Sequence, residues 1–183
     1  MTRNRVRIIG GAWRSRLIAF PPRPDLRPTP DRVRETLFNW LGQDLTGKAC
    51  LDLFAGSGAL GFEAASRGAR RVVMVERDPV VVRALAASRA ALDAAVVDIR
   101  RADALEFLRA GRDIYDVVFV DPPYRSDLWP RVAPLLPRHL APQALVYLER
   151  AGRGDALPGW GVCKQGRAGQ VAYQLLKRAE ALP

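Results

Sequence analysis

Apolar residues run along this chain in short blocks, and the clearest block spans residues 49–54. It carries one carboxylate, Asp52, and is followed at once by Gly56 and Gly58. A run that is apolar on both faces is typical of a central parallel strand. The two glycines can adopt positive φ angles, so they predict a tight turn into a helix over residues 59–67. The first N–H groups of that helix would favour an anionic group at the turn.

The same alternation of strand and helix patterns continues along the chain and predicts an α/β protein. Apolar blocks predict six further strands, at residues 71–75, 96–99, 114–120, 144–149, 160–164 and 170–177. Intervening segments predict helices at residues 31–41, 79–92 and 104–108. Because few residues separate the last two strands, they should pair antiparallel. The expected architecture is a Rossmann-like, seven-stranded mixed sheet with helices on both faces.

The N-terminal segment has its own pattern, in which basic and apolar residues alternate on both sides of Gly10 and Gly11. This pattern predicts a basic β-hairpin over residues 3–16. Residues 1–35 hold nine arginines and three acidic residues, and so contribute +6 of the net charge of +10. Clustered arginine beside an exposed aromatic ring favours RNA contacts, although a solvated edge hairpin is the simpler alternative. The candidate RNA-binding residues are Arg5, Arg7, Trp13, Arg14, Arg16, Arg32 and Arg34.

A proline-rich stretch over residues 20–30 predicts an extended linker, because clustered prolines cannot lie inside a helix. Thr29 is placed to cap the next helix, with Pro30 at its first position. We therefore divide the chain into a hairpin and linker over residues 1–28 and a main domain over residues 29–183.

Composition narrows the class of protein further. The chain has 183 residues and a net charge of +10, which favours a polyanionic partner. His139 is its one histidine, and Cys50 and Cys163 have no ligand spacing, so neither a metal site nor a disulfide framework is predicted. No signal peptide or membrane-spanning apolar run is present, which predicts a cytoplasmic protein.

The turn at Gly56 indicates a cofactor that contains adenosine. The glycines at positions 56, 58 and 61 fit the dinucleotide pattern, and Glu76 follows Gly56 by 20 residues, the spacing at which an acid reaches ribose hydroxyls. Asp52 would attract the cationic amino group of S-adenosylmethionine, whereas a pyrophosphate would gain nothing from it. The alternative is a tight turn that binds no ligand. Asp103 follows the next strand, where it could contact adenine or simply cap the helix after it.

A second motif, Asp121-Pro122-Pro123-Tyr124, ends the strand over residues 114–120. Two prolines offer carbonyl acceptors and no N–H, beside the Asp121 carboxylate and the flat ring of Tyr124. This set of groups would hold a planar base that carries an NH₂ group, with the amine lone pair aimed at an electrophile. Asp121, Pro122 and Tyr124 are therefore the candidate catalytic residues, and a rigid turn that closes a strand is the alternative.

With these motifs the chain resembles the Rossmann-like, class I S-adenosylmethionine-dependent N-methyltransferases. The N-terminal motifs over residues 7–16 and 27–38, with residues 168–173, resemble the bacterial family that methylates N2 of a guanine in 16S ribosomal RNA. The match covers nearly the whole chain. One departure is Pro30, where the family pattern has a second threonine.

The resemblance implies roles for matching residues. The turn with Asp52, Phe54, Gly56 and Gly58 would hold the methionine part of the cofactor, and Thr29 would lie beside it. Glu76 would bind the ribose, Asp103 the adenine, and Asp121 to Tyr124 the target guanine. The implied substrate is 16S rRNA in the small ribosomal subunit or its assembly intermediate, with a monomeric enzyme and no metal.

Two alternatives to this function stay open. An adenine-N6 DNA methyltransferase could use the same Asp121 motif, although the chain leaves no room for a target-recognition domain. A non-catalytic RNA-binding assembly factor could keep the basic hairpin alone, and intact Asp52, Glu76 and Asp121 argue against it.

Overall fold

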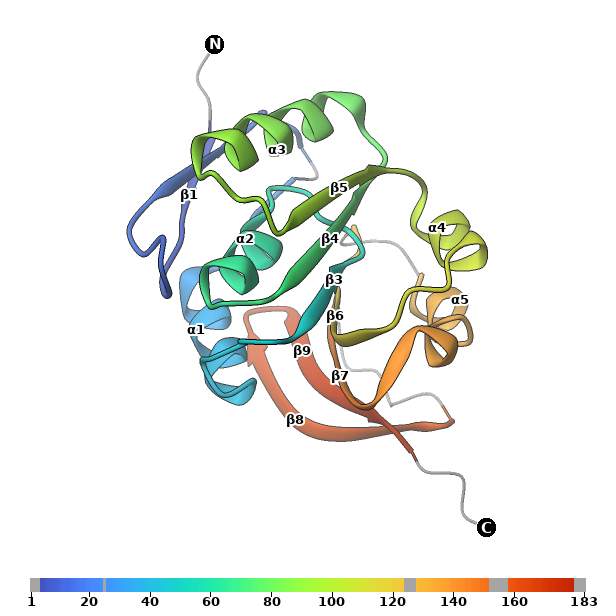
Figure 1. The fold of residues 1–183 in the computed structure, drawn as a ribbon. Helices are drawn as coiled ribbons and strands as arrows, with labels where there is room; N and C mark the ends of the chain where they lie inside the picture. The colour runs from blue at the N-terminus through green and yellow to red at the C-terminus, as the bar shows by residue number, and fades with distance from the viewer. Residues whose placement is uncertain (1–3, 25, 124–127, 152–157, 180–183) are drawn as a thin grey trace.

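Seven strands form one mixed sheet in the order β5-β4-β3-β6-β7-β9-β8 (Figure 1). The computed structural model describes residues 4–24, 26–123, 128–151 and 158–179. The strands are β3 (Ala49–Asp52), β4 (Arg71–Glu76), β5 (Val97–Arg101), β6 (Tyr115–Val120), β7 (Leu140–Ala151), β8 (Trp160–Ala168) and β9 (Val171–Arg178). Strands β3 to β7 are parallel, and β9 lies antiparallel between β7 and β8. The predicted mixed sheet and closing hairpin are confirmed.

Helices cover both faces of this sheet, as predicted (Figure 1). On one face lie α1 (Asp31–Trp40), α2 (Ala59–Ser66) and α3 (Pro79–Ala91), and on the other α4 (Ala104–Ala110) and α5 (Trp129–Val132). The sequence pattern did not predict α5 or the 3₁₀ turn Leu136–His139. Both are single turns that include a proline, so they are too short to show a helical period.

The N-terminal hairpin is present, but its second strand lies further along the chain than predicted. Strands β1 (Asn4–Arg7) and β2 (Leu17–Phe20) pair antiparallel, and residues 8–16 connect them. A Cβ at Gly11 would lie 1.9 Å from the Ser66 carbonyl oxygen, and the Trp13 N–H donates to Ser66 Oγ at 2.9 Å. The connection is therefore held on the end of α2 instead of forming a tight two-residue turn.

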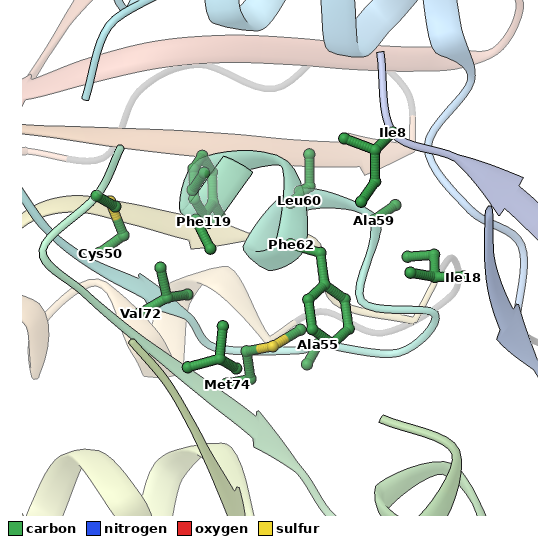
Figure 2. Packing of buried hydrophobic residues seen from close by; sticks show 14 of the residues in the cluster. Ile8, Ile18, Cys50, Ala55, Ala59, Leu60, Phe62, Val72, Met74 and Phe119 are labelled. Atoms are coloured by element: carbon green, nitrogen blue, oxygen red, sulfur yellow. The ribbon is translucent and has the colours of Figure 1, made fainter. Parts of the chain in front are cut away.

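The hairpin shares the core of the main sheet. Its buried side chains Ile8 and Ile18 belong to the same apolar cluster as Phe62 and Met74. Figure 2 shows Ile8 and Ile18 among the labelled side chains of this cluster. Burying such apolar side chains stabilises the attachment by about 1.5 to 3 kcal/mol each. The domain boundary at residue 28 stays a prediction, but the residues before it pack as part of one core.

One buried carboxylate, Glu63 of α2, ties the N-terminal segment to two helices. Its two oxygens accept hydrogen bonds from the N–H groups of Ile9 and Gly10 at 2.9 and 2.8 Å. They also pair with Arg67 at 2.9 Å and Arg34 at 3.3 Å. Arg34 is fully buried, so its predicted role in RNA binding is wrong. The reason is that Glu63 lies in an apolar interior and needs cationic partners there.

Candidate active site

A cavity of about 1390 Å³ lies at the carboxyl ends of the parallel strands. Each of the five strands brings one acidic residue to its wall: Asp52, Glu76, Asp103, Asp121 and Glu149. Strand order reverses at β3, whose neighbours are β4 and β6. In doubly wound folds, ligands bind beyond the strand ends at this reversal. The residues predicted to bind cofactor from four separate motifs therefore meet in one place.

The turn after β3 takes its shape from glycine. Gly58 has φ of 81°, and a Cβ there would lie 2.7 Å from the Phe62 ring. Gly58 packs behind the turn and does not line the cavity, whereas Phe54 and Gly56 do. The contribution of Gly58 in this structure is therefore to the path of the backbone.

Asp52 is an almost fully buried carboxylate beneath this turn. Its Oδ2 accepts a hydrogen bond from the Gly61 N–H at 3.0 Å, while its Oδ1 has no partner among the described residues. Burial, together with the smaller effect of the Glu76 charge, raises the pKa of Asp52 to about 7, against the Gly61 hydrogen bond. A cationic group in the cavity would supply the missing partner and favour the ionised form. The site therefore fits an ammonium group such as that of S-adenosylmethionine.

Glu76, at the end of β4, holds the same turn from the other side. Its two oxygens accept hydrogen bonds from the N–H groups of Gly56 at 3.1 Å and Asp78 at 2.8 Å. A carboxylate has further acceptor sites on both oxygens, which can take ribose hydroxyls. The ribose contact itself stays a prediction.

Asp103 caps α4, which is one of the two roles predicted for it. Its Oδ1 accepts hydrogen bonds from the N–H groups of Leu105 at 2.9 Å and Glu106 at 3.2 Å. It also lines the cavity, so the predicted contact with adenine stays a prediction.

The Asp121 motif lies directly after β6, and Thr29 reaches it from the segment before α1. Thr29 Oγ1 donates a hydrogen bond to Asp121 Oδ2 at 3.2 Å. Thr29 was predicted to cap α1, which is wrong, because Pro30 occupies the cap position without a side-chain bond and the Thr29 hydroxyl bonds Asp121 instead. Pro122 is buried and lines the cavity, whereas Tyr124 lies outside the described residues.

The electrostatics around Asp121 favour its neutral form. Burial raises its pKa well above the usual range, and the charges of Glu149 and Asp52 raise it further. The Thr29 hydrogen bond opposes this shift. A ligand that brings N–H donors to Asp121 would also stabilise its carboxylate.

Sequence reasoning missed Glu149 and Tyr147, which lie near the end of β7. The Tyr147 hydroxyl donates to Glu149 Oε2 at 2.9 Å, and Glu149 lines the cavity. Burial raises the pKa of Glu149, and the Tyr147 hydrogen bond lowers it. An acid that ends an apolar strand was the signal that identified Glu76, and the same signal at Glu149 went unused.

The proline-rich segment before α1 forms one wall of the cavity, so it does more than link two parts of the chain. An ion pair of 3.2 Å joins Arg23 to Asp78, and the Arg34 Nε donates to the Thr29 carbonyl at 3.1 Å. The wall residues are Pro24, Leu26, Arg27, Pro28, Thr29 and Pro30.

The predicted RNA-binding residues on the hairpin and α1, other than Arg34, reach the surface to different extents. Trp13 is half-buried against the core, contrary to the expected exposed aromatic ring. The exposed members are Arg5, Arg7, Arg14, Arg16 and Arg32. Their contact with RNA stays a prediction.

The part of the chain that the structure describes shows neither a cluster of potential metal ligands nor a helix that could span a membrane. Residues 4–24, 26–123, 128–151 and 158–179 contain no cluster of three potential metal ligands. No helix in those ranges is long and apolar enough to span a membrane. Cys50 is buried with its pKa raised to about 12, chiefly by burial, and Cys163 is exposed on β8.

The sheet topology and the acidic cavity define a Rossmann-like fold of the class I methyltransferases. A family model described as "Conserved hypothetical protein 95" matches residues 6–177. Ribosomal RNA small subunit methyltransferase D of Escherichia coli K12 is 43% identical over 180 residues, 96% of this chain and 91% of the relative. The Haemophilus influenzae protein of the same name is 38% identical over 181 residues, 94% of each chain. This chain therefore belongs to the ribosomal RNA small subunit methyltransferase D family, as its motifs predicted.

Solved structures support the same assignment of fold. The yhhF protein of Escherichia coli superposes with a TM-score of 0.85 at 43% identity, over 96% of this chain and 98% of that one. An RNA methyltransferase from Salinibacter ruber, solved with S-adenosyl-L-homocysteine, has a TM-score of 0.66 at 24% identity. That match covers 86% of this chain and 97% of the Salinibacter chain, and it supports the fold alone.

Proposed function

We propose that this protein transfers a methyl group from S-adenosylmethionine to N2 of one guanine in 16S rRNA of the small ribosomal subunit. The observation that carries the proposal is the placement of Asp121, which Thr29 holds at the cavity wall beside Pro122. Family membership supports rRNA as the substrate, since the relatives are named for methylation of small-subunit rRNA. The choice of guanine N2 rests on the Asp121 motif.

Within the cavity, the cofactor-binding residues divide by chemistry. Asp52 would pair with the amino group of S-adenosylmethionine, Glu76 with the ribose hydroxyls and Asp103 with the adenine amine. Phe54 and Gly56 form the adjoining wall. When bound there, S-adenosylmethionine supplies an electrophilic methyl group on a sulfonium centre.

Asp121 and Pro122 would prepare the guanine amine. That amine is a weak nucleophile because its lone pair is delocalised into the ring, and two acceptors on its hydrogens would fix the direction of the lone pair. The Asp121 carboxylate accepts one hydrogen, and the Pro122 carbonyl accepts the other. As positive charge develops on N2, the ionised Asp121 stabilises it, and once the methyl group has moved from sulfur to N2 the acidic N2 proton passes to the Asp121 carboxylate. Tyr124 would stack on the base after the base leaves its helix.

No residue of the chain is needed as a covalent nucleophile. The Cys50 thiol is buried and its raised pKa disfavours a thiolate, while Cys163 lies on β8 and does not line the cavity. The exposed arginines of the hairpin would bind rRNA phosphates, and this partner agrees with the predicted cytoplasmic location.

Purified protein with tritiated S-adenosylmethionine tests the proposal. The acceptors are small subunits from cells lacking the protein, naked 16S rRNA and double-stranded DNA, followed by nucleoside analysis. We expect N2-methylguanosine from the particle, and Asp121→Ala to slow single-turnover transfer at least 100-fold. Asp44→Ala, which removes an exposed acid that bonds Thr46, is the matched control. Appearance of N6-methyladenosine, or cofactor binding without any transfer, would overturn the proposal.

A further inference from the structure

Two carboxylates share one side of the cavity because of the strand register. Strands β6 and β7 pair in parallel up to Val120 and Leu148. Asp121 follows Val120 directly, and Glu149 follows Leu148. Both line the cavity, and the Glu149 charge raises the pKa of Asp121. Like charges in adjacent, desolvated positions are costly, so this arrangement favours a ligand that brings several N–H donors in a row.

Glu149 is held in a defined position. The Tyr147 hydroxyl donates to Glu149 Oε2 at 2.9 Å, and the Tyr147 ring is fully buried. That ring packs with Phe119 and with Tyr173, each at 6.5 Å between ring centroids. One donated hydrogen bond leaves acceptor sites on the carboxylate, which has about four. The packed tyrosine therefore orients an acceptor that still has capacity for a ligand.

The edge of guanine presents a row of donors that suits this pair. Its N2 amine and its N1–H are adjacent, whereas N1 of adenine is a bare acceptor. We propose that Glu149 is a specificity residue that accepts the N1–H of the target guanine, beside Asp121 on the N2 amine. The role rests on the proposed function and deepens it. A base with a bare N1 would place the N1 lone pair against the Glu149 carboxylate and leave that carboxylate without a donor. A site with a buried, unpaired acceptor strongly rejects such a base.

Base analogues separate this role from the chemistry of the amine. The substrate is the small subunit reconstituted with rRNA that carries guanine, 2-aminopurine or 6-thioguanine at the methylated position. All three keep the N2 amine, but 2-aminopurine has a bare N1 and 6-thioguanine keeps N1–H while changing the group at position 6. For the wild-type protein we expect single-turnover rates at least 100-fold lower with 2-aminopurine than with guanine, and a smaller loss with 6-thioguanine.

The decisive variant is Glu149→Gln, because an amide can accept from N1–H or donate to a bare N1. We expect its preference for guanine over 2-aminopurine to fall to within about tenfold. Glu35→Gln, an exposed position on α1, should keep the wild-type preference. An unchanged preference in Glu149→Gln overturns the role of Glu149 while leaving the proposed function intact. Failure of the wild-type protein to methylate guanine in the particle overturns the proposed function itself.

Tyr147→Phe keeps the buried ring and removes only the hydroxyl that orients Glu149. It decides the question if Glu149→Gln shows no cooperative urea unfolding transition and so is not folded. A several-fold loss of preference for guanine over 2-aminopurine supports the proposal, and an unaltered preference contradicts it.

Discussion

Thr29 Oγ1 donates a hydrogen bond to Asp121 Oδ2 at 3.2 Å across 92 residues of sequence. The bond joins the proline-rich wall of the cavity to the end of β6. It lowers the pKa of Asp121, against the larger effects of burial and of the neighbouring carboxylates. Thr29 therefore helps to keep Asp121 in the ionised form that the proposed reaction requires.

Replacing Thr29 with valine tests this relationship, since valine has nearly the same shape and no hydroxyl. Loss of the donor raises the pKa of Asp121, so the ionised fraction at a given pH falls. We expect the acidic limb of the pH–rate profile for single-turnover methylation to move to higher pH. The rate near neutral pH should fall about tenfold, since a hydrogen bond to a charged group is worth about 1.5 to 3 kcal/mol. Thr29→Ser should behave as the wild type, and an acidic limb unmoved in Thr29→Val would refute the role.

Asp52 predicts a pH-dependent cofactor affinity. Its pKa of about 7 in the unliganded protein means that its carboxylate is lost as pH falls through neutrality. Affinity for S-adenosylhomocysteine, whose amino group is cationic, should therefore decrease below pH 7 and become insensitive to pH in this range in Asp52→Asn. Calorimetry across pH 5.5 to 8.5, at about half-unit steps around this pKa, measures both. An affinity in the wild type that is constant across this range would contradict the assignment.

The raised pKa of Asp52 also predicts how the free energy of unfolding depends on pH. The folded-state pKa of Asp52 is raised above its ordinary value of 3.8, so the stability present at low pH is lost as pH rises through about 7. Asp52→Asn should therefore increase the free energy of unfolding of the unliganded protein at pH 8 and have little effect at pH 4. Urea denaturation at the two pH values would show this, and a variant less stable than wild type at pH 8 would count against it.

Much of the site could be predicted from short-range chemistry. Acids that end apolar strands, at Asp52, Glu76 and Asp121, follow from strand periodicity and the rule that ligands bind at strand ends. The capping role of Asp103 followed from its position before a helix, and the structure confirms it.

What could not be predicted depends on contacts between distant segments. Arg34 has the sequence context of a surface arginine, and only the fold places it against Glu63, 29 residues away. Thr29 has the pattern of a helix cap, and a distant carboxylate competes for its hydroxyl. The second hairpin strand was displaced because Ser66 of α2 binds the connecting residues. Local patterns carry no information on such partners.

Arg34→Ala should lower the free energy of unfolding of the protein alone, in the absence of RNA. Removing one partner of a buried ion pair typically costs about 3 to 5 kcal/mol, because the remaining charge loses its compensation. Arg32, exposed on the same helix, is the matched control, and Arg32→Ala should change the free energy of unfolding by less than about 0.5 kcal/mol. Urea denaturation compares the two variants. Equal stability of Arg34→Ala and the wild type would show that the buried pair does not hold the N-terminal segment.

Exposed arginines of the hairpin should control rRNA affinity and its dependence on salt. If Arg14 and Arg16 each bind one phosphate, then Arg14→Ala or Arg16→Ala should reduce the slope of log affinity against log salt by roughly 0.9. Arg178→Ala, at the exposed end of β9, should leave the slope unchanged. Filter binding of small subunits at several salt concentrations gives the slopes. Slopes equal to wild type in both hairpin variants would favour the solvated-edge interpretation.

The most direct measurement is a map of modified guanines in 16S rRNA from cells that lack this protein. We expect one guanine to lose its N2-methyl group, with the modification restored by the wild-type gene and not by Asp121→Ala. If the deletion strain keeps every N2-methylguanine that the wild type has, the proposed function is contradicted. If Asp121→Ala restores the modification, the role of Asp121 is contradicted.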